Sequence, residues 1–271
     1  MSVDAFHTML DRLKALPVKT IDVIGGEPTI HPGIVRIIRE AERRGYQVNL
    51  SSNGTQPDVL REMLSRRTRL TVGISINDRE TLEDLRDFVQ RQNPVVKTVF
   101  HRPIDTALIR DIISLRPEKF YLIYRDAMER AELVHTVPFP QFMNTVANHA
   151  NALQVGTVYC SGFIPDIQHY PELAHARCPA GTTKLGVMPD GSVYPCNLLF
   201  GRTEFLLGNI LTDPFEVIWR HPALGFFRSF AENACMQTSC ELHGRCHGGC
   251  PAHSLLLSGD IAAPDPRCSP A

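Results

Sequence analysis

The sequence predicts an α/β fold in which a parallel sheet or barrel is followed by a small cysteine-rich domain. Two observations lead to this prediction. In the N-terminal half, short apolar runs rich in β-branched residues alternate with amphipathic helical segments, as βαβ units require. The eight cysteines then all lie between Cys160 and Cys268, where this alternation gives way to turns and glycines.

The apolar runs are nearly continuous, which is typical of parallel strands buried on both faces. Amphipathic helices are predicted around them, for example where Ile34, Ile37, Ile38 and Ala41 share one face. Active sites of such folds lie at the carboxyl ends of the strands. The predicted strands are Thr20–Gly26, Val48–Ser52, Leu70–Ile76, Val95–Phe100, Phe120–Tyr124 and, after a helix over Pro140–Leu153, Val155–Cys160.

The C-terminal part has different local signals. Residues 184–196 predict a β-hairpin, with Pro189-Asp190-Gly191 at its turn. A helix is expected to begin at Asp213 as the N-cap, with Pro214 in its first position. We therefore divide the chain into two predicted domains, residues 1–160 and residues 161–271.

The composition excludes several classes of protein. Lys and Arg total 28 and Asp and Glu total 29, so the net charge of −1 gives no reason to expect nucleic acid or an anionic membrane as partner. There is no apolar run of about 18 residues that could span a membrane, and the N-terminus lacks the features of a secretory signal. These observations predict a cytoplasmic protein. Its thiols should then serve a metal or catalysis, although an exported chain could use them in disulfides.

The strongest signal is the spacing of the last seven cysteines. Closely spaced thiolates on a glycine-rich segment can converge on one soft metal centre, and backbone N–H groups there can bind cluster sulfurs. Four cysteines also make a good tetrahedral zinc site, so the spacing alone leaves iron–sulfur and zinc open. The order is Cys178, Cys196, Cys235-x4-Cys240-x5-Cys246-x3-Cys250 and Cys268.

This order, with the segments CPAG and DGSVYPC, resembles the SPASM domain, a cysteine-rich C-terminal extension of many radical S-adenosylmethionine enzymes. The departure is four residues between Cys235 and Cys240, where the family usually has two. The resemblance implies two auxiliary [4Fe–4S] clusters. A first cysteine group (Cys178, Cys196 and Cys250) would hold one cluster, whose fourth position is open to substrate or is filled by Cys160 or a non-cysteine group. A second cysteine group would hold the other cluster, and consists of Cys235, Cys240, Cys246 and Cys268.

The N-terminal half carries motifs that point to the same family. Gly25-Gly26-Glu27-Pro28, directly after the first predicted strand, resembles the GGEP motif that binds the methionine amino group of S-adenosylmethionine. Without the resemblance it would be an ordinary βα turn. Ser52-Asn53-Gly54 is similar to the T/S-N-G motif near the cofactor, and a simple Asn-Gly turn is the alternative. Ser75 ends the third strand, where relatives line the cofactor or substrate cavity.

The family's Cys-x3-Cys-x2-Cys motif, which holds the cluster that reduces S-adenosylmethionine, does not occur in this sequence. The resemblance therefore implies a partial (β/α) radical-SAM-type barrel that lacks its first strand, with Thr20–Gly26 at an unpaired edge. Either Met1 is an internal methionine of a longer natural chain, or the protein is a degenerate member that keeps only auxiliary clusters. We expect this chain not to cleave S-adenosylmethionine reductively.

The resemblance implies a function as well. The complete form would be a radical enzyme that modifies a peptide or protein side chain by hydrogen-atom abstraction, with a reductant such as flavodoxin or ferredoxin as partner. Whether this chain is itself an enzyme stays open. The alternatives are a non-catalytic iron–sulfur protein for electron transfer or peptide binding, and a zinc-stabilised module.

Overall fold

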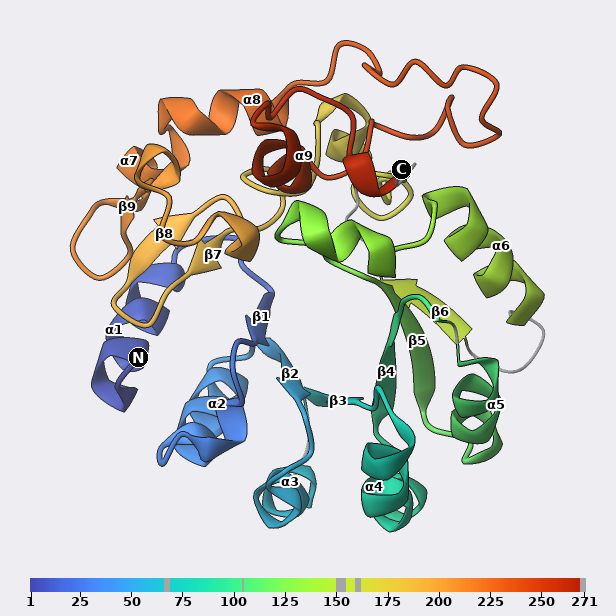
Figure 1. The fold of residues 1–271 in the computed structure, drawn as a ribbon. Helices are drawn as coiled ribbons and strands as arrows, with labels where there is room; N and C mark the ends of the chain where they lie inside the picture. Colours follow the sequence, from blue (N-terminus) through green and yellow to red (C-terminus); the bar gives the residue numbers. More distant parts are fainter. Residues whose placement is uncertain (66–68, 104, 150–154, 159–161, 269–271) are drawn as a thin grey trace. The chain divides into compact units, whose positions relative to one another are not determined.

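The computed structural model describes residues 1–65, 69–103, 105–149, 155–158 (backbone only) and 162–268 (Figure 1). These residues form two compact units. We call residues 2–123 with 144–158 the sheet unit, and residues 124–143 with the described part of 159–271 the cysteine unit. The sequence predictions did not include the assignment of 124–143 to the second unit. The predicted domain boundary, between residues 160 and 161, adjoins residues outside the described part and stays a prediction.

A six-stranded sheet, with its strands in the order of the sequence, confirms the predicted α/β fold. The pairs β1–β2, β2–β3, β3–β4 and β5–β6 are parallel. Each strand coincides with one of the apolar runs, to within three residues at either end. The strands are β1 (Thr20–Val23), β2 (Gln47–Ser52), β3 (Leu70–Ser75), β4 (Val95–Phe100), β5 (Lys119–Tyr124) and β6 (Val155–Val158).

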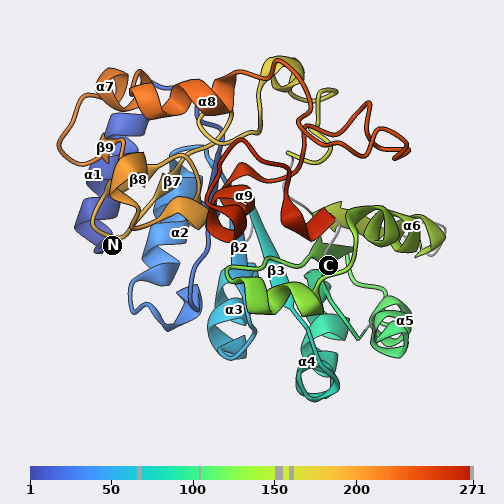
Figure 2. The same cartoon turned by 45° about the horizontal axis from the view of Figure 1, so that its top comes forward.

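Five helices of the sheet unit follow one another along the chain and cover the convex side of the curved sheet (Figures 1 and 2). In the second of them, Ile34, Ile37, Ile38 and Ala41 are buried, as their spacing predicts. The helices are α1 (Val3–Leu13), α2 (Ile34–Arg43), α3 (Pro57–Leu64), α4 (Arg79–Gln92) and α5 (Thr106–Ser114), and α6 (Phe139–His149) follows β5.

Strand β1 is at the edge of the sheet. It pairs with β2, and no other described strand lies beside it. Its residues alternate between exposed and half-buried, and Ile24 just after it is 53% exposed. The expected unpaired edge is therefore present in the described part of the chain.

The cysteine unit contains the predicted hairpin, extended by a short third strand. Strands β7 (Gly186–Val187) and β8 (Ser192–Tyr194) are antiparallel, and β9 (Gly208–Asn209) pairs with β8. At the turn, the Asp190 carboxylate accepts a hydrogen bond from the Ser192 N–H (2.9 Å). The remaining helices are short: α7 (Phe215–Trp219), α8 (Gly225–Arg228) and α9 (Pro251–Ser258).

The prediction that Asp213 caps a helix is wrong. The N-cap of α7 is Pro214, which offers no side-chain hydrogen bond. Asp213 instead accepts a hydrogen bond from the Asn209 N–H (2.8 Å), so its carboxylate stabilises the turn that leads from β9 to α7. The local sequence pattern predicted the helix correctly, but it did not predict that the Asp213 carboxylate bonds to Asn209.

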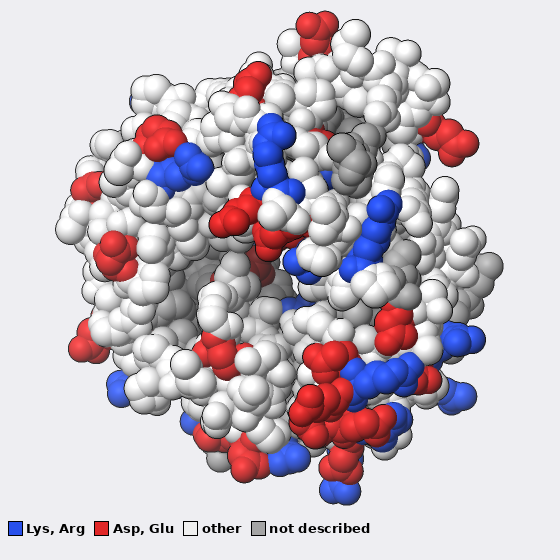
Figure 3. Space-filling view, in the orientation of Figure 1, with Lys and Arg blue, Asp and Glu red and all other residues white. Residues whose placement is uncertain are grey.

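Acidic and basic side chains are interspersed on the face shown in Figure 3, including over α4. This distribution agrees with the balanced composition. In the described residues, no helix combines the length and the apolar character needed to cross a membrane.

Candidate functional site

The loop after β1 and the end of β2 are joined by the carboxylate of Glu27. Its Oε1 accepts hydrogen bonds from the Thr29 N–H (3.0 Å) and from the Ser52 hydroxyl (2.9 Å), and its Oε2 accepts one from the Asn53 N–H (2.6 Å). Gly25 and Gly26 have positive φ values of 95° and 50°, a conformation that side chains disfavour, and the turn between strand and Glu27 depends on it. Hydrogen bonds to Glu27 thus connect two of the predicted motifs, Gly25-Gly26-Glu27-Pro28 and Ser52-Asn53-Gly54, at the ends of β1 and β2.

The next two strands, β3 and β4, carry Ser75 and Lys97. Ser75 lies at the end of β3, opposite Lys97 of β4 in the strand register. The Lys97 ammonium donates a hydrogen bond to the Ser51 hydroxyl. Burial lowers the pKa of Lys97, while the carboxylate of Glu27 acts in the opposite direction. The Lys97 ammonium and the Glu27 carboxylate therefore provide a cation and an anion near the ends of β1 and β2. The sequence analysis missed Lys97 because it stands in the middle of an apolar run.

The hydrogen bonds of Glu27 lead to a prediction about how the thermal stability of the protein depends on pH. Burial raises the pKa of Glu27, but its hydrogen bonds from Asn53, Thr29 and Ser52 outweigh burial, so its pKa lies below the ordinary value of 4.5. A carboxyl with a lowered folded-state pKa stabilises the fold above its unfolded pKa, and this stability is lost as the pH falls through the folded value. We expect wild-type thermal stability to fall more steeply between about pH 5 and pH 3 than that of Glu27→Gln.

The measurement is the midpoint of thermal unfolding, followed by circular dichroism at pH steps. Glu62→Gln is the matched control, because the Glu62 carboxylate is exposed and pairs with Arg39 at the surface (2.8 Å). Parallel curves for the wild type and Glu27→Gln would show that the Glu27 hydrogen bonds add no net stability.

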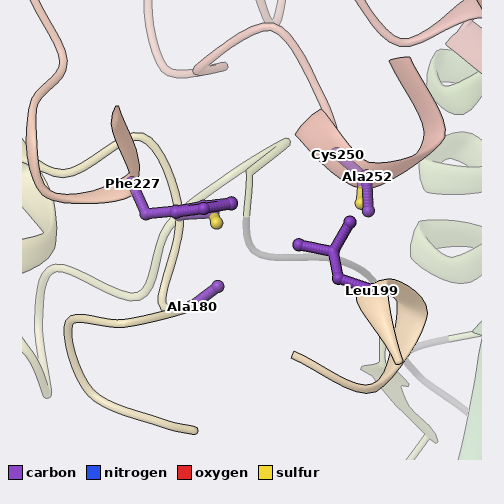
Figure 4. Packing of buried hydrophobic residues seen from close by; sticks show 6 residues of the cluster. Ala180, Leu199, Phe227, Cys250 and Ala252 are labelled. Carbon is purple, nitrogen blue, oxygen red and sulfur yellow. The ribbon is translucent and has the colours of Figure 1, made fainter. Parts of the chain in front are cut away.

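The first cysteine group lies in an apolar cluster of the cysteine unit. Cys178 and Cys250 are 4% and 3% exposed, and half-buried Cys196 packs against the same cluster. Figure 4 shows Leu199 and Phe227 pointing toward its centre from two sides. Three cysteines from well-separated segments thus pack in or against one apolar cluster. Cys160, a suggested fourth ligand, lies outside the described residues.

The second cysteine group lines one pocket. Cys235, Cys240, Cys246 and Cys268 all contribute to its wall, together with apolar side chains that include Phe139 and Leu242. No disulfide joins any of the seven described cysteines. Within the described residues, no group of three or more His, Cys, Asp or Glu side chains is close enough to hold a metal ion. The four thiols, however, are the donor set that a [4Fe–4S] cluster requires.

The segment Cys246–Cys250, which we call the shared loop, connects the two groups, since it carries one cysteine of each. The Gly248 N–H donates a hydrogen bond to the Cys246 sulfur (3.2 Å), as N–H groups do toward cluster sulfurs. Gly249 has a φ of 81°, and a Cβ placed there would be 2.2 Å from the Cβ of Asp265. The loop therefore needs glycine both for its backbone conformation and for the close approach of Asp265.

Two thiols of the pocket, Cys246 and Cys268, have a pKa above the ordinary value for cysteine. Burial, together with the neighbouring thiols of Cys246 and Cys235, raises the pKa of Cys268 to about 12. Burial also raises the pKa of Cys246, although N–H groups of the shared loop and the Arg177 charge oppose it. Metal binding must displace these protons, so loading should be favoured at alkaline pH.

The polar side chain of Asn233, beside the pocket, was missed by sequence reasoning. The Asn233 side chain donates hydrogen bonds to the carbonyls of Cys246 (2.7 Å) and His243 (3.2 Å) and accepts one from the Cys235 N–H (3.0 Å). The His243 ring lies 3.0 Å from the Cys235 carbonyl oxygen. A single Asn in a loop gives no signal in a sequence, whereas here Asn233 and His243 both support the backbone that carries the thiols.

The described residues thus form an α/β sheet unit with a glycine-rich loop at its strand ends, and a second unit that is rich in cysteine. The profile of the Radical SAM superfamily matches residues 1–99. The profile of SPASM, an iron–sulfur cluster-binding domain, matches residues 178–251. The chain therefore carries a segment of the radical SAM superfamily followed by a SPASM domain, as its motifs predict.

Several curated relatives match nearly the whole chain. A PqqA peptide cyclase of Streptomyces rochei is 27% identical over 99% of this chain and 80% of the relative. The antilisterial bacteriocin subtilosin biosynthesis protein AlbA of Bacillus subtilis is 25% identical over 92% of this chain and 60% of the relative.

Two solved structures share the fold. Streptococcus suis SuiB superposes with a TM-score of 0.72 and 18% identity, over 99% of this chain and 71% of SuiB. The structure of anSMEcpe with bound AdoMet gives a TM-score of 0.71 and 15% identity, over 99% of this chain and 85% of the other. SuiB has also been solved with its precursor peptide, SuiA.

Proposed function

We propose that this chain binds two auxiliary [4Fe–4S] clusters in its cysteine unit and S-adenosylmethionine at the strand ends of its sheet unit, and that its complete form modifies a peptide. The observation that carries the proposal is the convergence of Cys235, Cys240, Cys246 and Cys268 on one pocket. Four thiols in a partly apolar wall suit a soft iron–sulfur centre.

The first cysteine group supports the second cluster of the proposal. Cys178, Cys196 and Cys250 pack in one apolar cluster, which would shield a bound centre from water. Three thiols leave one position for a further ligand or for substrate. In this family the clusters and S-adenosylmethionine supply the radical and electron-transfer chemistry.

The sheet unit would bind the amino-acid end of S-adenosylmethionine. This end is a zwitterion, and the strand ends offer the exposed backbone of Gly25 and Gly26 next to Glu27, and the Lys97 ammonium for a carboxylate. Glu27 itself is occupied by four hydrogen bonds, so its part is to hold the loop in place.

A peptide or protein substrate is proposed from the relatives, since PqqA peptide cyclase and the SuiB complex with SuiA both name a peptide. An electron donor such as flavodoxin or ferredoxin would reduce the clusters. Unprotected thiols and clusters are best maintained in a reducing compartment, so we propose the cytoplasm as the location.

The test is the content of iron, acid-labile sulfide and zinc per chain after anaerobic purification and reconstitution. Two clusters give about eight iron and about eight sulfide, with negligible zinc. About four of each would reduce the proposal to a single cluster. One or two zinc ions without sulfide would overturn it in favour of a zinc-stabilised module.

Lys97→Met tests the proposed S-adenosylmethionine site. A hydrogen bond to a charged group contributes about 1.5–3 kcal/mol, so the dissociation constant should rise about tenfold to a hundredfold. The measurement is equilibrium dialysis with radiolabelled S-adenosylmethionine. Lys119→Met is the control, because Lys119 is an exposed lysine at the start of β5. Equal binding by the wild type and Lys97→Met would exclude Lys97 from the site.

A further inference from the structure

The shared loop, Cys246–Cys250, is held from two sides by charged side chains that are almost completely buried. Arg177 is 7% exposed and Asp265 is 3% exposed. One is a cation that contacts two carbonyl groups of the loop, and the other is an anion that contacts one of its N–H groups. Because the loop carries a thiol of each cysteine group, these charges contact backbone between two proposed cluster ligands.

Arg177 directly precedes Cys178 of the first cysteine group. Its guanidinium donates hydrogen bonds to the carbonyls of His247 and of Gly249 (2.8 Å). The Arg177 backbone N–H donates to the Phe227 carbonyl (2.8 Å), which fixes the base of the side chain. Arg177 therefore joins the segment of one cysteine group to the loop that carries a thiol of the other.

Asp265 contacts the same loop through different atoms. Its Oδ2 accepts a hydrogen bond from the Cys250 N–H (2.9 Å), and its own N–H donates to the Gly248 carbonyl (2.9 Å). The carboxylate also pairs with Arg267 (2.7 Å). The negative charge on this side is thus balanced by a neighbouring cation.

We propose that Arg177 is a positioning residue that sets the reduction potential of the proposed auxiliary clusters, by holding its positive charge against the shared loop. The inference rests on the proposed function, because it requires clusters at the cysteine groups. A fixed cation stabilises the more negative, reduced state of a cluster, and charge and hydrogen bonding are among the factors that set cluster potentials.

The experiment is a redox titration of the reconstituted full chain, followed by electron paramagnetic resonance. Arg177→Gln should shift at least one cluster midpoint potential to a lower value, and Arg177→Lys, which keeps the charge, should restore it toward the wild type. Asp265→Asn should shift a potential upward, because it leaves the charge of Arg267 less compensated. Arg202→Gln is the control, since Arg202 is at the surface and pairs with Glu204 (3.3 Å).

Opposite shifts in Arg177→Gln and Asp265→Asn support the proposal, because a purely structural role would not reverse sign with charge. If Arg177→Gln fails to assemble clusters, Asp265→Asn decides alone: a raised potential supports the proposal and an unchanged one overturns it. Potentials equal to the wild type in both variants, or loss of clusters from both, would overturn it. A wild-type chain that assembles no cluster would overturn the proposed function, and this inference with it, whereas normal iron and sulfide with unshifted potentials would overturn the inference alone.

Discussion

Replacing Cys246 with alanine is expected to reduce the iron content of the reconstituted chain from about eight to about four atoms. Cys246 shares the wall of one pocket with Cys235, Cys240 and Cys268. A cluster that loses one of four thiolates loses both a strong ligand and part of its electrostatic stabilisation. The cluster of the first cysteine group should remain, because its thiols lie in a separate apolar cluster. The measurement is iron and acid-labile sulfide per chain, with the visible absorption of the clusters.

Double variants test the grouping of the cysteines. Cys246→Ala with Cys268→Ala removes two ligands of one group and should still leave about four iron. Cys246→Ala with Cys196→Ala removes one ligand from each group and should leave almost none. The second pair is the matched comparison, because both variants lose two thiols. Equal iron in the two double variants would show that the seven cysteines do not form two independent sites.

The strands could be predicted because each is a short run of apolar, often β-branched residues that requires burial on both faces. The run Val95–Phe100 became β4 without a change of boundary. The same local signal concealed Lys97, since a charged residue within an apolar run reads as an interruption. Its role depends on Ser51 and Glu27 of the neighbouring strand ends, which only the register of the sheet brings near.

Spacing alone could not assign the cysteines to their groups. The cysteines from Cys235 to Cys250 follow one another at short intervals, yet Cys246 and Cys250, four residues apart, are assigned to different groups. The assignment came from the family resemblance and stays a prediction; in the structure the cysteines of the second group line a pocket, and those of the first group pack in an apolar cluster. Between these two cysteines, Gly248 and Gly249 both have positive φ values, which lets the backbone turn sharply there.

The buried charges of the cysteine unit had no sequence signal. Arg267 donates a hydrogen bond to the Arg125 carbonyl (2.9 Å) from a position 142 residues away, and its guanidinium stacks over the ring of Tyr124 (5.0 Å). In the sequence it is an arginine near the C-terminus, where a solvated side chain is the ordinary expectation. Contacts at this separation explain why 124–143 joins the cysteine unit, and local patterns cannot predict them.

Arg267→Met is expected to reduce the free energy of unfolding of the metal-free chain by about 3–5 kcal/mol, the usual effect of removing one partner of a buried ion pair. The Arg267 side chain is 1% exposed and Asp265 has no exposed side-chain surface. Without the guanidinium, Asp265 keeps the Cys250 N–H as donor but loses its nearest positive charge. The buried carboxylate would then have to be protonated or brought into contact with water, and either process opposes folding.

Urea unfolding followed by tryptophan fluorescence measures this effect in the right place, because the single tryptophan, Trp219, lies in the cysteine unit. Arg202→Met is the matched control, since Arg202 and its partner Glu204 are 38% and 54% exposed. A surface pair contributes less than about 1 kcal/mol. Adding Asp265→Asn to Arg267→Met should recover part of the loss, because no unpaired charge then remains buried. A loss in Arg267→Met as small as that of the control would mean that Asp265 finds another partner, and that the pair does not stabilise the segment that carries Cys268.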